Sequence, residues 1–479
     1  MNALRRIGSL ILLLNLLLIY PNVIAQPKLS SIFTDNMVLQ QKADVAVWGW
    51  GKAGSTISIR TSWNGRRYSG KVSNDGSWKI KVNTPAAGGP YELSISDSKT
   101  LTLKNVLIGE VWICSGQSNM EMPVKGFKAQ PITGSNDAIL KSRNNNIRVY
   151  TVPRSSVTER QNNSKPSAWK VAEPESVSAF SATGYFYGRL LNEMLNVPVG
   201  LINVSYSGSF IEAWMSPDAL KSYKDIKIPA KGDTIKAVSR TPTTLYNGML
   251  YPIAGYGARG AIWYQGESNY ERPDQYEELF PAMVSEWRKL WNIGDFPFYY
   301  VQIAPYNYLQ LPPYNFGGKF NSAYLRDAQR KSQSKIQNSA MAVVLDLGEE
   351  NSIHPANKEQ AGKRLALLAL ANTYGMKGFG AASPMYKSIA ISGGTATITF
   401  DNAGNGLTSF GKELANFEIA GSNKTFYPAK AVISGSSVSL SSPMVKEPVA
   451  VRYAFKDFVV GDLFNTEGLP ASSFRTDDW

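Results

Sequence analysis

Histidine and cysteine are almost absent from this sequence of 479 residues, which contains His354 and Cys114 as the single member of each type. A zinc site built on several histidines or cysteines is therefore excluded, because zinc sites in proteins need three or four ligands. Metal-free chemistry or a site made of carboxylates alone remains, and we expect no metal. If an imidazole acts as an acid or base near neutral pH, it belongs to His354.

Long apolar runs are absent after the first 25 residues. Arg5 and Arg6 precede the apolar run at residues 10–19, and Val23-Ile24-Ala25 forms a small-residue cleavage pattern, as in an export signal. No later stretch approaches the ~20 uninterrupted apolar residues of a membrane helix. We therefore expect cleavage after Ala25, no membrane insertion afterwards, and an exported protein that is periplasmic or secreted. A single cysteine permits no intramolecular disulfide, so stability must come from core burial.

Runs of basic residues are also missing, although the formal net charge is +13. The lysines and arginines are spread along the whole chain, which favours a solvated basic surface over a nucleic-acid site. We expect no nucleic acid as a partner. An acidic glycan fits an exported basic protein better, and the sequence leaves the oligomeric state open.

The spacing of apolar residues predicts three domains. Residues 26–105 contain alternating stretches and the turn pairs Asn64-Gly65 and Asp75-Gly76, which are typical of a small β-sandwich. Residues 106–375 alternate short apolar runs with amphipathic segments of helix length, the pattern of a parallel, doubly wound α/β sheet. Residues 376–479 return to strand-like alternation and predict a C-terminal β module.

The central domain should contain five buried strands and four helices. The strands are expected at 106–114, 199–204, 260–265, 298–304 and 341–347, and the helices at 183–195, 274–291, 321–334 and 356–373. Residues 123–179 have no clear period and are rich in Asn, Ser and Pro. We expect them to form a long insertion over the sheet that could line the site.

Polar clusters follow four of the predicted strands, and functional groups in open α/β sheets gather at such carboxyl ends. Ser118 follows the first strand and His354 follows the last. A serine hydroxyl is a poor nucleophile without a base, so the sequence predicts that Ser118 attacks and His354 takes its proton. Taken singly, Ser118 would be a turn serine that caps a helix, and His354, before Pro355, a residue at a helix terminus.

The chain resembles the sialate O-acetylesterase-like carbohydrate esterases of the SGNH hydrolase superfamily. The matching segments are Gly116-Gln117-Ser118-Asn119-Met120, residues 262–269, Ile353-His354-Pro355 with Asn357-Lys358, and residues 468–476. They occur in family order across nearly the whole mature chain. The resemblance implies a flavodoxin-like fold and a cofactor-independent serine esterase that removes O-acetyl groups from acetylated sialic acids or sialoglycans.

The resemblance also implies donors for the oxyanion of the tetrahedral intermediate. The backbone N–H groups of Ser118 and Gly208 match the first two donors of the family, and the side chain of Gln265 is the expected third, with Asn269 as the alternative. Relatives commonly carry two glycines where this chain has Ser207 and Gly208. Which of these two N–H groups faces the substrate stays open at this point.

The residue that orients His354 does not follow the family pattern, because Asn351 and Ser352 stand where relatives carry an aspartate. Glu267 is the expected substitute, since residues i and i+2 of an extended chain point to the same side and Gln265 ends the same strand. A structural role for Glu267, and a Ser-His dyad held by a backbone carbonyl, are the alternatives.

Substrate contacts are expected from Asn269 and from Trp214 as a platform for the sugar ring, although most tryptophans in such a sheet belong to the core. Two other functions stay open. The motifs do not separate a sialic acid esterase from an acetyl xylan esterase. The flanking β modules and the missing aspartate are also compatible with a glycan-binding protein that has no activity.

Overall fold

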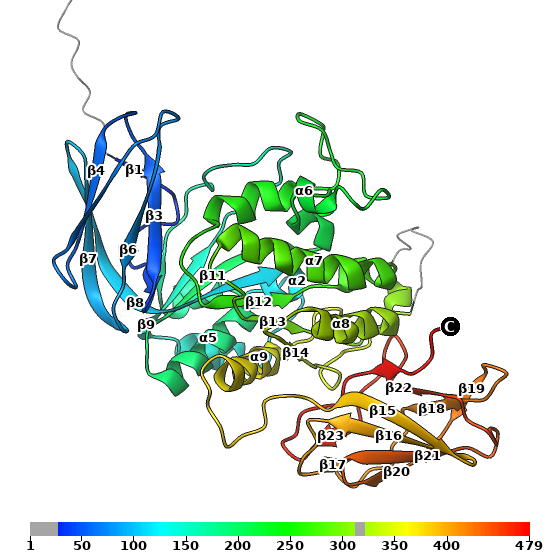
Figure 1. Ribbon diagram of the computed structural model, residues 1–479. Helices are drawn as coiled ribbons and strands as arrows, with labels where there is room; N and C mark the ends of the chain where they lie inside the picture. The colour runs from blue at the N-terminus through cyan, green and yellow to red at the C-terminus, as the bar shows by residue number, and fades with distance from the viewer. Residues whose placement is uncertain (1–26, 312–320) are drawn as a thin grey trace, which may run out of the picture.

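The computed structural model describes residues 27–311 and 321–479, and the predicted export signal at residues 1–25 lies outside them. Figure 1 shows an antiparallel β unit near the N-terminus, a central sheet flanked by helices, and a second antiparallel β unit near the C-terminus. Within the described ranges, no helix combines the length and the apolar character that a bilayer-spanning segment needs.

The N-terminal unit consists of short strands joined by tight turns. They are β1 (Lys28–Leu29), β2 (Val38–Gln40), β3 (Asp44–Trp50), β4 (Thr56–Thr61), β5 (Arg67–Lys71), β6 (Ser77–Asn83) and β7 (Gly88–Ser96). Asn64-Gly65 joins the antiparallel pair β4 and β5, with a φ of 67° at Gly65 that suits glycine. Asp75-Gly76 instead connects β5 to β6, which belong to different sheets.

Strand β8 (Thr100–Gly116) runs from the N-terminal unit into the central sheet. Its first half pairs with β7, and its second half pairs in parallel with β11 (Val199–Ser205) and β12 (Gly260–Tyr264). The boundary predicted at residue 105 therefore falls inside one continuous strand. Because both units share β8, the end of this strand is anchored from two sides.

The central sheet confirms the predicted doubly wound α/β class. Its strand order is β10 (Lys170–Ala172), β9 (Asn144–Thr151), β11, β8, β12, β13 (Phe298–Val301) and β14 (Ser339–Ala342). All neighbours from β9 to β14 are parallel. Strand β8 lies between β11 and β12, which follow it in the chain on opposite sides, so the topological switch point lies at the carboxyl end of β8.

Four helices cover the sheet in two pairs, as the apolar periodicity predicts. Helices α5 (Ala182–Leu195) and α9 (Lys358–Asn372) pack on one face, and α7 (Pro273–Trp291) and α8 (Ala323–Lys335) pack on the other. The core on the side of α5 includes Trp112, whereas the core on the side of α7 includes Trp263. Burial of both faces explains why the strands read as continuous apolar runs.

The end of β14 and the start of α9, the two elements on either side of His354, differ from the sequence prediction. Strand β14 ends at Ala342, whereas the prediction extended it to residue 347. Helix α9 begins at Lys358, because the side chain of Asn357 caps it by accepting a hydrogen bond from the N–H of Gln360 at 3.2 Å. His354 and Pro355 therefore lie in a loop before the helix, and Pro355 is not its first residue.

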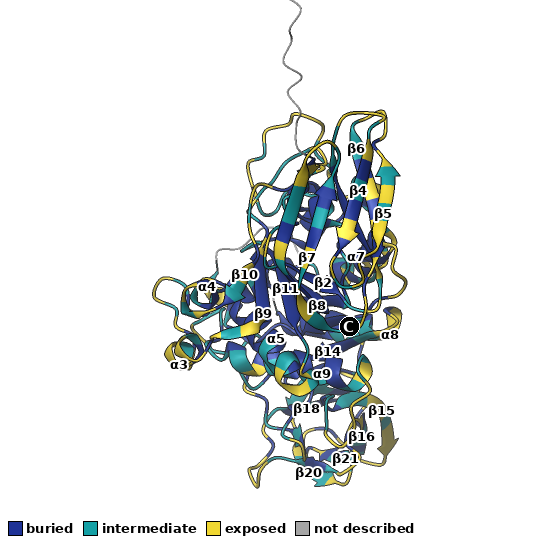
Figure 2. Ribbon diagram, turned by 90° about the vertical axis from the view of Figure 1, so that its left-hand side faces the viewer, coloured by how far each residue is buried: buried dark blue, intermediate teal, exposed yellow. Residues whose placement is uncertain are grey.

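The predicted insertion, residues 123–179, is partly ordered into regular structure. It contains α3 (Ser135–Leu140) and α4 (Pro174–Ser178), and it supplies the edge strand β10 and its neighbour β9. Figure 2 shows that β11, in the middle of the central sheet, is buried, whereas much of α3 and of the edge strand β5 is exposed.

The C-terminal unit consists of antiparallel strands that pack against the central domain. They are β15 (Met385–Ser392), β16 (Thr395–Asp401), β17 (Leu407–Thr408), β18 (Phe417–Ala420), β19 (Phe426–Pro428), β20 (Lys430–Ser434), β21 (Ser437–Ser441), β22 (Ala450–Tyr453), β23 (Phe464–Asn465) and β24 (Phe474–Arg475). Arg326 of α8 is fully buried and donates to the carbonyls of Ala454 and Lys456 and to the hydroxyl of Ser473. This side chain fastens the unit to the helix layer.

Candidate active site

One cavity of about 460 Å³ brings together residues from four strand ends that are far apart in the sequence. Ser118 follows β8, Gly208 follows β11, Glu267 follows β12 and His354 lies in the loop after β14. All four line the cavity. The convergence matches the expectation that functional groups collect at the carboxyl ends of parallel strands.

Ser118 is the first residue of the short helix α2 (Ser118–Glu121), directly after the turn that ends β8. Gly116 forms this turn with a φ of 140°, and a Cβ there would lie 2.1 Å from the carbonyl oxygen of Tyr264. The side-chain oxygen of Gln117 accepts from the N–H of Ser268 at 3.2 Å. Glycine at 116 and the amide of Gln117 therefore fix the serine against the end of β12.

His354 is held by a side chain from the insertion. The oxygen Oε1 of Gln130 lies 2.7 Å from Nδ1 of His354. With a carbonyl-type oxygen as acceptor, Nδ1 carries the hydrogen, and Nε2 then has a free lone pair. The ring of Phe127 packs edge-on against the imidazole, with 5.5 Å between the ring centres. This is the tautomer that a general base acting through Nε2 requires.

The imidazole of His354 is also kept neutral. Burial, and then the positive charge of Lys358, lower its pKa from 6.5 to about 4. The structure contains no hydrogen bond between Ser118 and His354, both of which are described. Catalytic hydrogen bonds are often long before substrate binds, so the shared cavity rather than a formed bond places the two residues together.

Glu267 differs from its expected position as the partner of His354. Its carboxylate is fully buried, and Oε1 accepts a hydrogen bond from Nδ2 of Asn119 at 2.5 Å, while Oε2 has no partner. Burial raises the pKa of this carboxyl group. In this structure Gln130, and not Glu267, is the partner of Nδ1. No pattern in the sequence pointed to Gln130, because it lies in the insertion without a clear period.

The structure distinguishes between Ser207 and Gly208 as oxyanion donors. The N–H and the hydroxyl of Ser207 both donate to Oε2 of Glu121, the N–H at 2.7 Å. Gly208 has a φ of 69°, and no described residue accepts a hydrogen bond from its N–H. The carbonyl of Gly208 accepts from Ser239 Oγ at 3.3 Å and from Arg240 Nε at 3.4 Å. Gly208 is therefore the residue whose N–H is available to the cavity.

Gln265 and Asn269 do not lie where the sequence placed them, and both expectations need correction. Nε2 of Gln265 donates to the carbonyl of Ser209 at 3.0 Å and to Oδ1 of Asn269 at 2.7 Å. Both of its amide hydrogens are thus used inside the protein. Nδ2 of Asn269 donates to Glu212 at 2.9 Å. Both side chains are buried outside the cavity lining, so neither donates to an oxyanion or contacts substrate in this arrangement.

Trp214 also belongs to the core and not to a sugar platform. Its side chain is fully buried, its Nε1 donates to Ser209 Oγ at 2.9 Å, and its ring packs edge-on against Trp263. A large aromatic side chain between a sheet and its helices buries a large apolar area, which stabilises the fold. Trp214 has this role and is not exposed to a substrate.

The insertion contributes to the cavity, as the sequence suggested. Phe127, Lys128 and Gln130 from the insertion line it, and Arg240 lines it from a loop on the other side of Gly208. Lys128 and Arg240 give the lining two positive charges. Among the described residues that line the cavity, the single carboxylate is that of the buried Glu267. The rim of the cavity is therefore suited to an anionic ligand.

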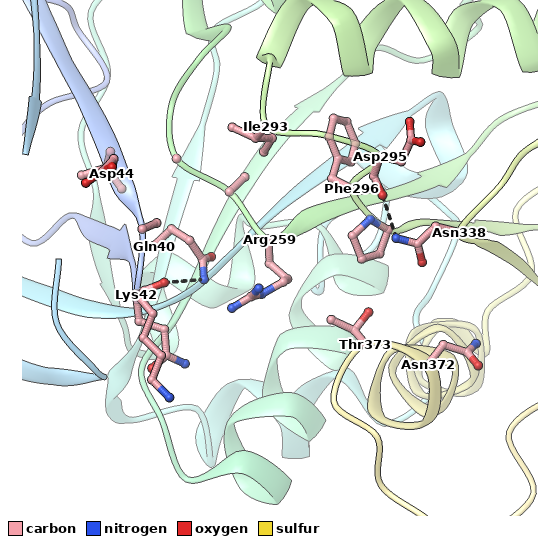
Figure 3. Close-up of a pocket in the computed structure, with 16 residues that line it drawn as sticks. Gln40, Lys42, Asp44, Arg259, Ile293, Asp295, Phe296, Asn338, Asn372 and Thr373 are labelled. Carbon is pink, nitrogen blue, oxygen red and sulfur yellow. Dashed lines mark hydrogen bonds between the residues drawn. The ribbon is translucent and has the colours of Figure 1, made fainter. Parts of the chain in front are cut away.

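A second cavity, of about 440 Å³, lies at the other end of the strands, where β2 and β3 of the N-terminal unit meet the central domain (Figure 3). Arg259 lines it and forms a two-point ion pair with the buried Glu110, at 2.7 and 2.9 Å. Lys42, Asn338 and Thr373 also line it. No serine or histidine is among these described lining residues, so this cavity lacks the groups for acyl transfer.

Residues 27–311 and 321–479 contain no group of three or more His, Cys, Asp or Glu side chains placed to hold a metal ion. Cys114 is fully buried in β8, shortly before the turn that leads to Ser118, and burial raises the pKa of its thiol. A protonated thiol in an apolar core is a packing residue and neither a ligand nor a nucleophile.

Comparison with known proteins gives consistent matches along the chain. The family model described as "Carbohydrate esterase, sialic acid-specific acetylesterase" matches residues 108–371. Sialate O-acetylesterase of Mus musculus is 28% identical, with 78% of this chain and 79% of that protein covered. The Homo sapiens enzyme is 29% identical, with 76% and 74% covered.

One solved structure is similar over nearly the entire chain. It is a novel carbohydrate acetylesterase from Xanthomonas citri, 33% identical, with a TM-score of 0.85. The match covers 95% of this chain and 100% of that one. The β units on both sides of the central domain are therefore part of the shared architecture.

Proposed function

We propose a mechanism and a substrate for this chain, which belongs to the carbohydrate esterase family of sialic acid-specific acetylesterases. The chain is a carbohydrate acetylesterase. In our proposal it removes O-acetyl groups from acetylated sialic acids or sialoglycans, with Ser118 as nucleophile and His354 as general base. The observation that carries the mechanism is that both residues line one cavity while Gln130 holds the imidazole in the required tautomer.

The proposed reaction has two steps through an acetyl-enzyme. Oγ of Ser118 attacks the acetyl carbonyl while Nε2 of His354 takes the hydroxyl proton, and the imidazolium then returns this proton to the departing sugar oxygen. A water molecule, deprotonated by the same nitrogen, then attacks the acetyl-serine. The bond from Oγ to the acetyl carbon breaks, the imidazolium returns the proton to Oγ of Ser118, and acetate leaves. The N–H groups of Ser118 and Gly208 stabilise the negative charge on the carbonyl oxygen in both steps.

The proposal assigns different roles to Gln130 and Glu267. Gln130 orients His354 directly through Nδ1. Glu267 acts one residue further away, because its carboxylate holds the amide of Asn119, which follows the nucleophile. A neutral amide in place of the usual aspartate fixes the tautomer but adds no negative charge beside the imidazolium.

An acidic sugar is the substrate we favour over acetylated xylan. Lys128 and Arg240 line the cavity around Ser118, and the related mouse and human proteins are named sialate O-acetylesterases. A carboxylate on the substrate would be attracted by these two cations. Acetyl xylan is neutral at its acetylated sugar and gains nothing from them, so it is the second candidate.

Replacement of the nucleophile tests the mechanism. Ser118→Ala removes one oxygen from a buried residue, so the change is small and the fold should persist. Acetate release from an acetylated sialoside should fall by about 10³-fold or more, to the level left by binding and oxyanion donors. Undiminished turnover in a pure preparation of this variant would eliminate the serine mechanism.

Replacement of Arg240 tests the substrate class. Arg240→Gln should lower kcat/KM for acetylated sialosides more than for a neutral acetylated sugar, and added salt should reduce the difference. Arg143→Gln is the matched control, because Arg143 is exposed and does not line the cavity. Equal loss on acidic and neutral substrates would remove the case for an acidic sugar and favour xylan.

We also propose that the enzyme acts outside the cytoplasm, on the basis of the signal-like residues 1–25. The mature N-terminus should then be Gln26. Mass spectrometry of the protein recovered from the periplasm or medium tests this, and an uncleaved chain retained in the cytoplasm would contradict it.

A further inference from the structure

The two peptide carbonyls on either side of His354 are each held by a buried side chain. Nδ2 of Asn119 donates to the carbonyl of Ile353 at 3.0 Å. Nζ of Lys358 donates to the carbonyl of Pro355. Asn119 is fully buried and Lys358 is 1% exposed. The loop that carries His354 is therefore fixed on both sides of the imidazole, although it belongs to no helix or strand.

Asn119 connects three parts of the site at once. It follows Ser118 in helix α2, its amide group also donates to Glu267, and it holds the loop of His354 through Ile353. A shift of the nucleophile turn relative to the histidine loop would break one of these bonds. Asn119 thus sets the spacing between the residue that attacks and the residue that takes the proton.

Lys358 occupies a costly position for a lysine. No carboxylate oxygen lies within 4.0 Å of its ammonium among the described residues, since none of the ion pairs there includes it. A buried ammonium without a close counter-ion is unfavourable, because it loses its hydration and gains no close partner in exchange. The more distant Glu267 and Glu349 offset only part of this cost. An apolar side chain would fill the same space at lower cost, which indicates a function for the charge.

We propose that Asn119 and Lys358 are positioning residues of the esterase reaction, and that the ammonium of Lys358 also keeps the imidazole of His354 deprotonated and ready to act as a base. This inference rests on the proposed function of His354. It goes beyond that function, because neither residue touches the reacting atoms and both act through the loop that carries the histidine.

The charged groups around His354 come from several elements. Lys358 at the start of α9, Lys128 of the insertion and Arg240 beside Gly208 are positive, and Glu267 and Glu349 are negative. Among them, Lys358 donates to the carbonyl of Pro355, the residue after His354, and its charge lowers the pKa of His354 in addition to burial. A positive charge disfavours the imidazolium, so the neutral base persists to lower pH.

The ionisation of Lys358 fits this role. Burial lowers its pKa from 10.5 to about 7. The ammonium is therefore charged across the acidic range, which is where an ordinary histidine with a pKa near 6.5 would take up a proton. The charge of Lys358 is therefore present at the acidic pH values at which protonation of His354 would otherwise stop the reaction.

Three variants and one control separate the hydrogen bond from the charge. Lys358→Met removes both, and Lys358→Gln keeps a donor for Pro355 without the charge. Asn119→Ala removes the hydrogen bonds to Ile353 and Glu267 and leaves the charge of Lys358 in place. Lys363→Met is the matched control, because Lys363 lies on the same helix with 38% of its side chain exposed and pairs with Glu359. Hydrolysis of 4-nitrophenyl acetate by the full-length enzyme is followed from pH 3 to 9.

Lys358→Met should lower kcat about tenfold or more with little change in KM, and should move the acid limb of kcat/KM up by about one pH unit or more. Lys358→Gln should move the limb similarly but lose less in kcat. Asn119→Ala should lower kcat and leave the limb where it is, because the charge remains. Lys363→Met should change neither quantity.

Unchanged kcat and an unchanged acid limb in folded Lys358→Met would overturn the inference. If the methionine variant does not fold, the position of the limb in Lys358→Gln decides alone, since that variant keeps a hydrogen bond in the loop. A failure here is distinct from a failure of the proposed function. If Ser118→Ala inactivates the enzyme but Lys358→Met has no effect, the serine mechanism stands and only the role of Lys358 is refuted.

Discussion

Oε1 of Gln130 and Nδ1 of His354 lie 2.7 Å apart although 224 positions separate the two residues in the sequence. A neutral amide thus takes the place at the imidazole that an acid usually fills in serine esterases. It supplies an acceptor that fixes the tautomer, but it adds no charge that would favour the imidazolium. Burial, and then the positive charge of Lys358, leave His354 with a lowered pKa.

The first prediction concerns the pH dependence of the unmodified enzyme. The pKa of His354 is lowered from 6.5 to about 4, so the neutral base persists well below pH 6 and is lost only as the pH falls through about 4. The acid limb of kcat/KM should therefore lie near pH 4 and not near 6.5. A limb at the ordinary histidine position would show that the imidazole is solvated or paired with an anion in the working enzyme.

The second prediction concerns Gln130. Gln130→Leu removes the acceptor at Nδ1, so kcat should fall on the order of tenfold to hundredfold as the imidazole loses its orientation. Gln130→Glu should restore orientation and add a negative charge, which raises the pKa of His354 and moves the acid limb up by about one to two pH units. Gln360→Leu, on an exposed position of α9, is the control and should behave as wild type.

The third prediction contrasts Glu267 with Gln130. Glu267→Gln keeps an oxygen that can accept from Asn119, and burial already disfavours the charge of the carboxylate by raising its pKa. We expect a loss in kcat of less than about tenfold, smaller than that of Gln130→Leu. If the order of the two effects is reversed, Glu267 returns as the group that supports the imidazolium.

The fourth prediction concerns Trp214. Its side chain is fully buried against Trp263, so Trp214→Ala should lower the free energy of unfolding by about 3–5 kcal/mol through the cavity that it creates. KM should stay unchanged at temperatures where the variant is folded. Urea unfolding and steady-state kinetics measure the two quantities, and a raised KM without loss of stability would restore Trp214 as a substrate contact.

The fifth prediction concerns metals. Incubation with EDTA should leave the rate of ester hydrolysis unchanged, because the proposed reaction draws its nucleophile, base and oxyanion donors from the chain itself. Loss of activity that added zinc or manganese restores would require a metal-bound mechanism instead.

The elements of the fold were predictable because their signals are local. The apolar runs of the central strands and the amphipathic spacing of α5 and α7 depend only on residues that are close in the sequence. Their alternation predicts the doubly wound class. The errors occur where long-range contacts decide. Strand β14 stops at Ala342 and α9 starts only at Lys358, since the loop between them is held by Asn119 and Lys358 rather than by its own periodicity.

By itself, the sequence determined that Ser118 and His354 follow different strands of one parallel sheet, because carboxyl ends of parallel strands meet at a common edge. The tertiary structure alone decided which polar side chains around them are available. The amide of Gln265 is consumed by Ser209 and Asn269, whereas that of Gln130 reaches the imidazole. A side chain's residue type states which hydrogen bonds it can form. Packing determines which partners lie within reach. In a buried site each donor forms its hydrogen bond with the acceptor that the fold places beside it, because an unpaired buried polar group is unfavourable.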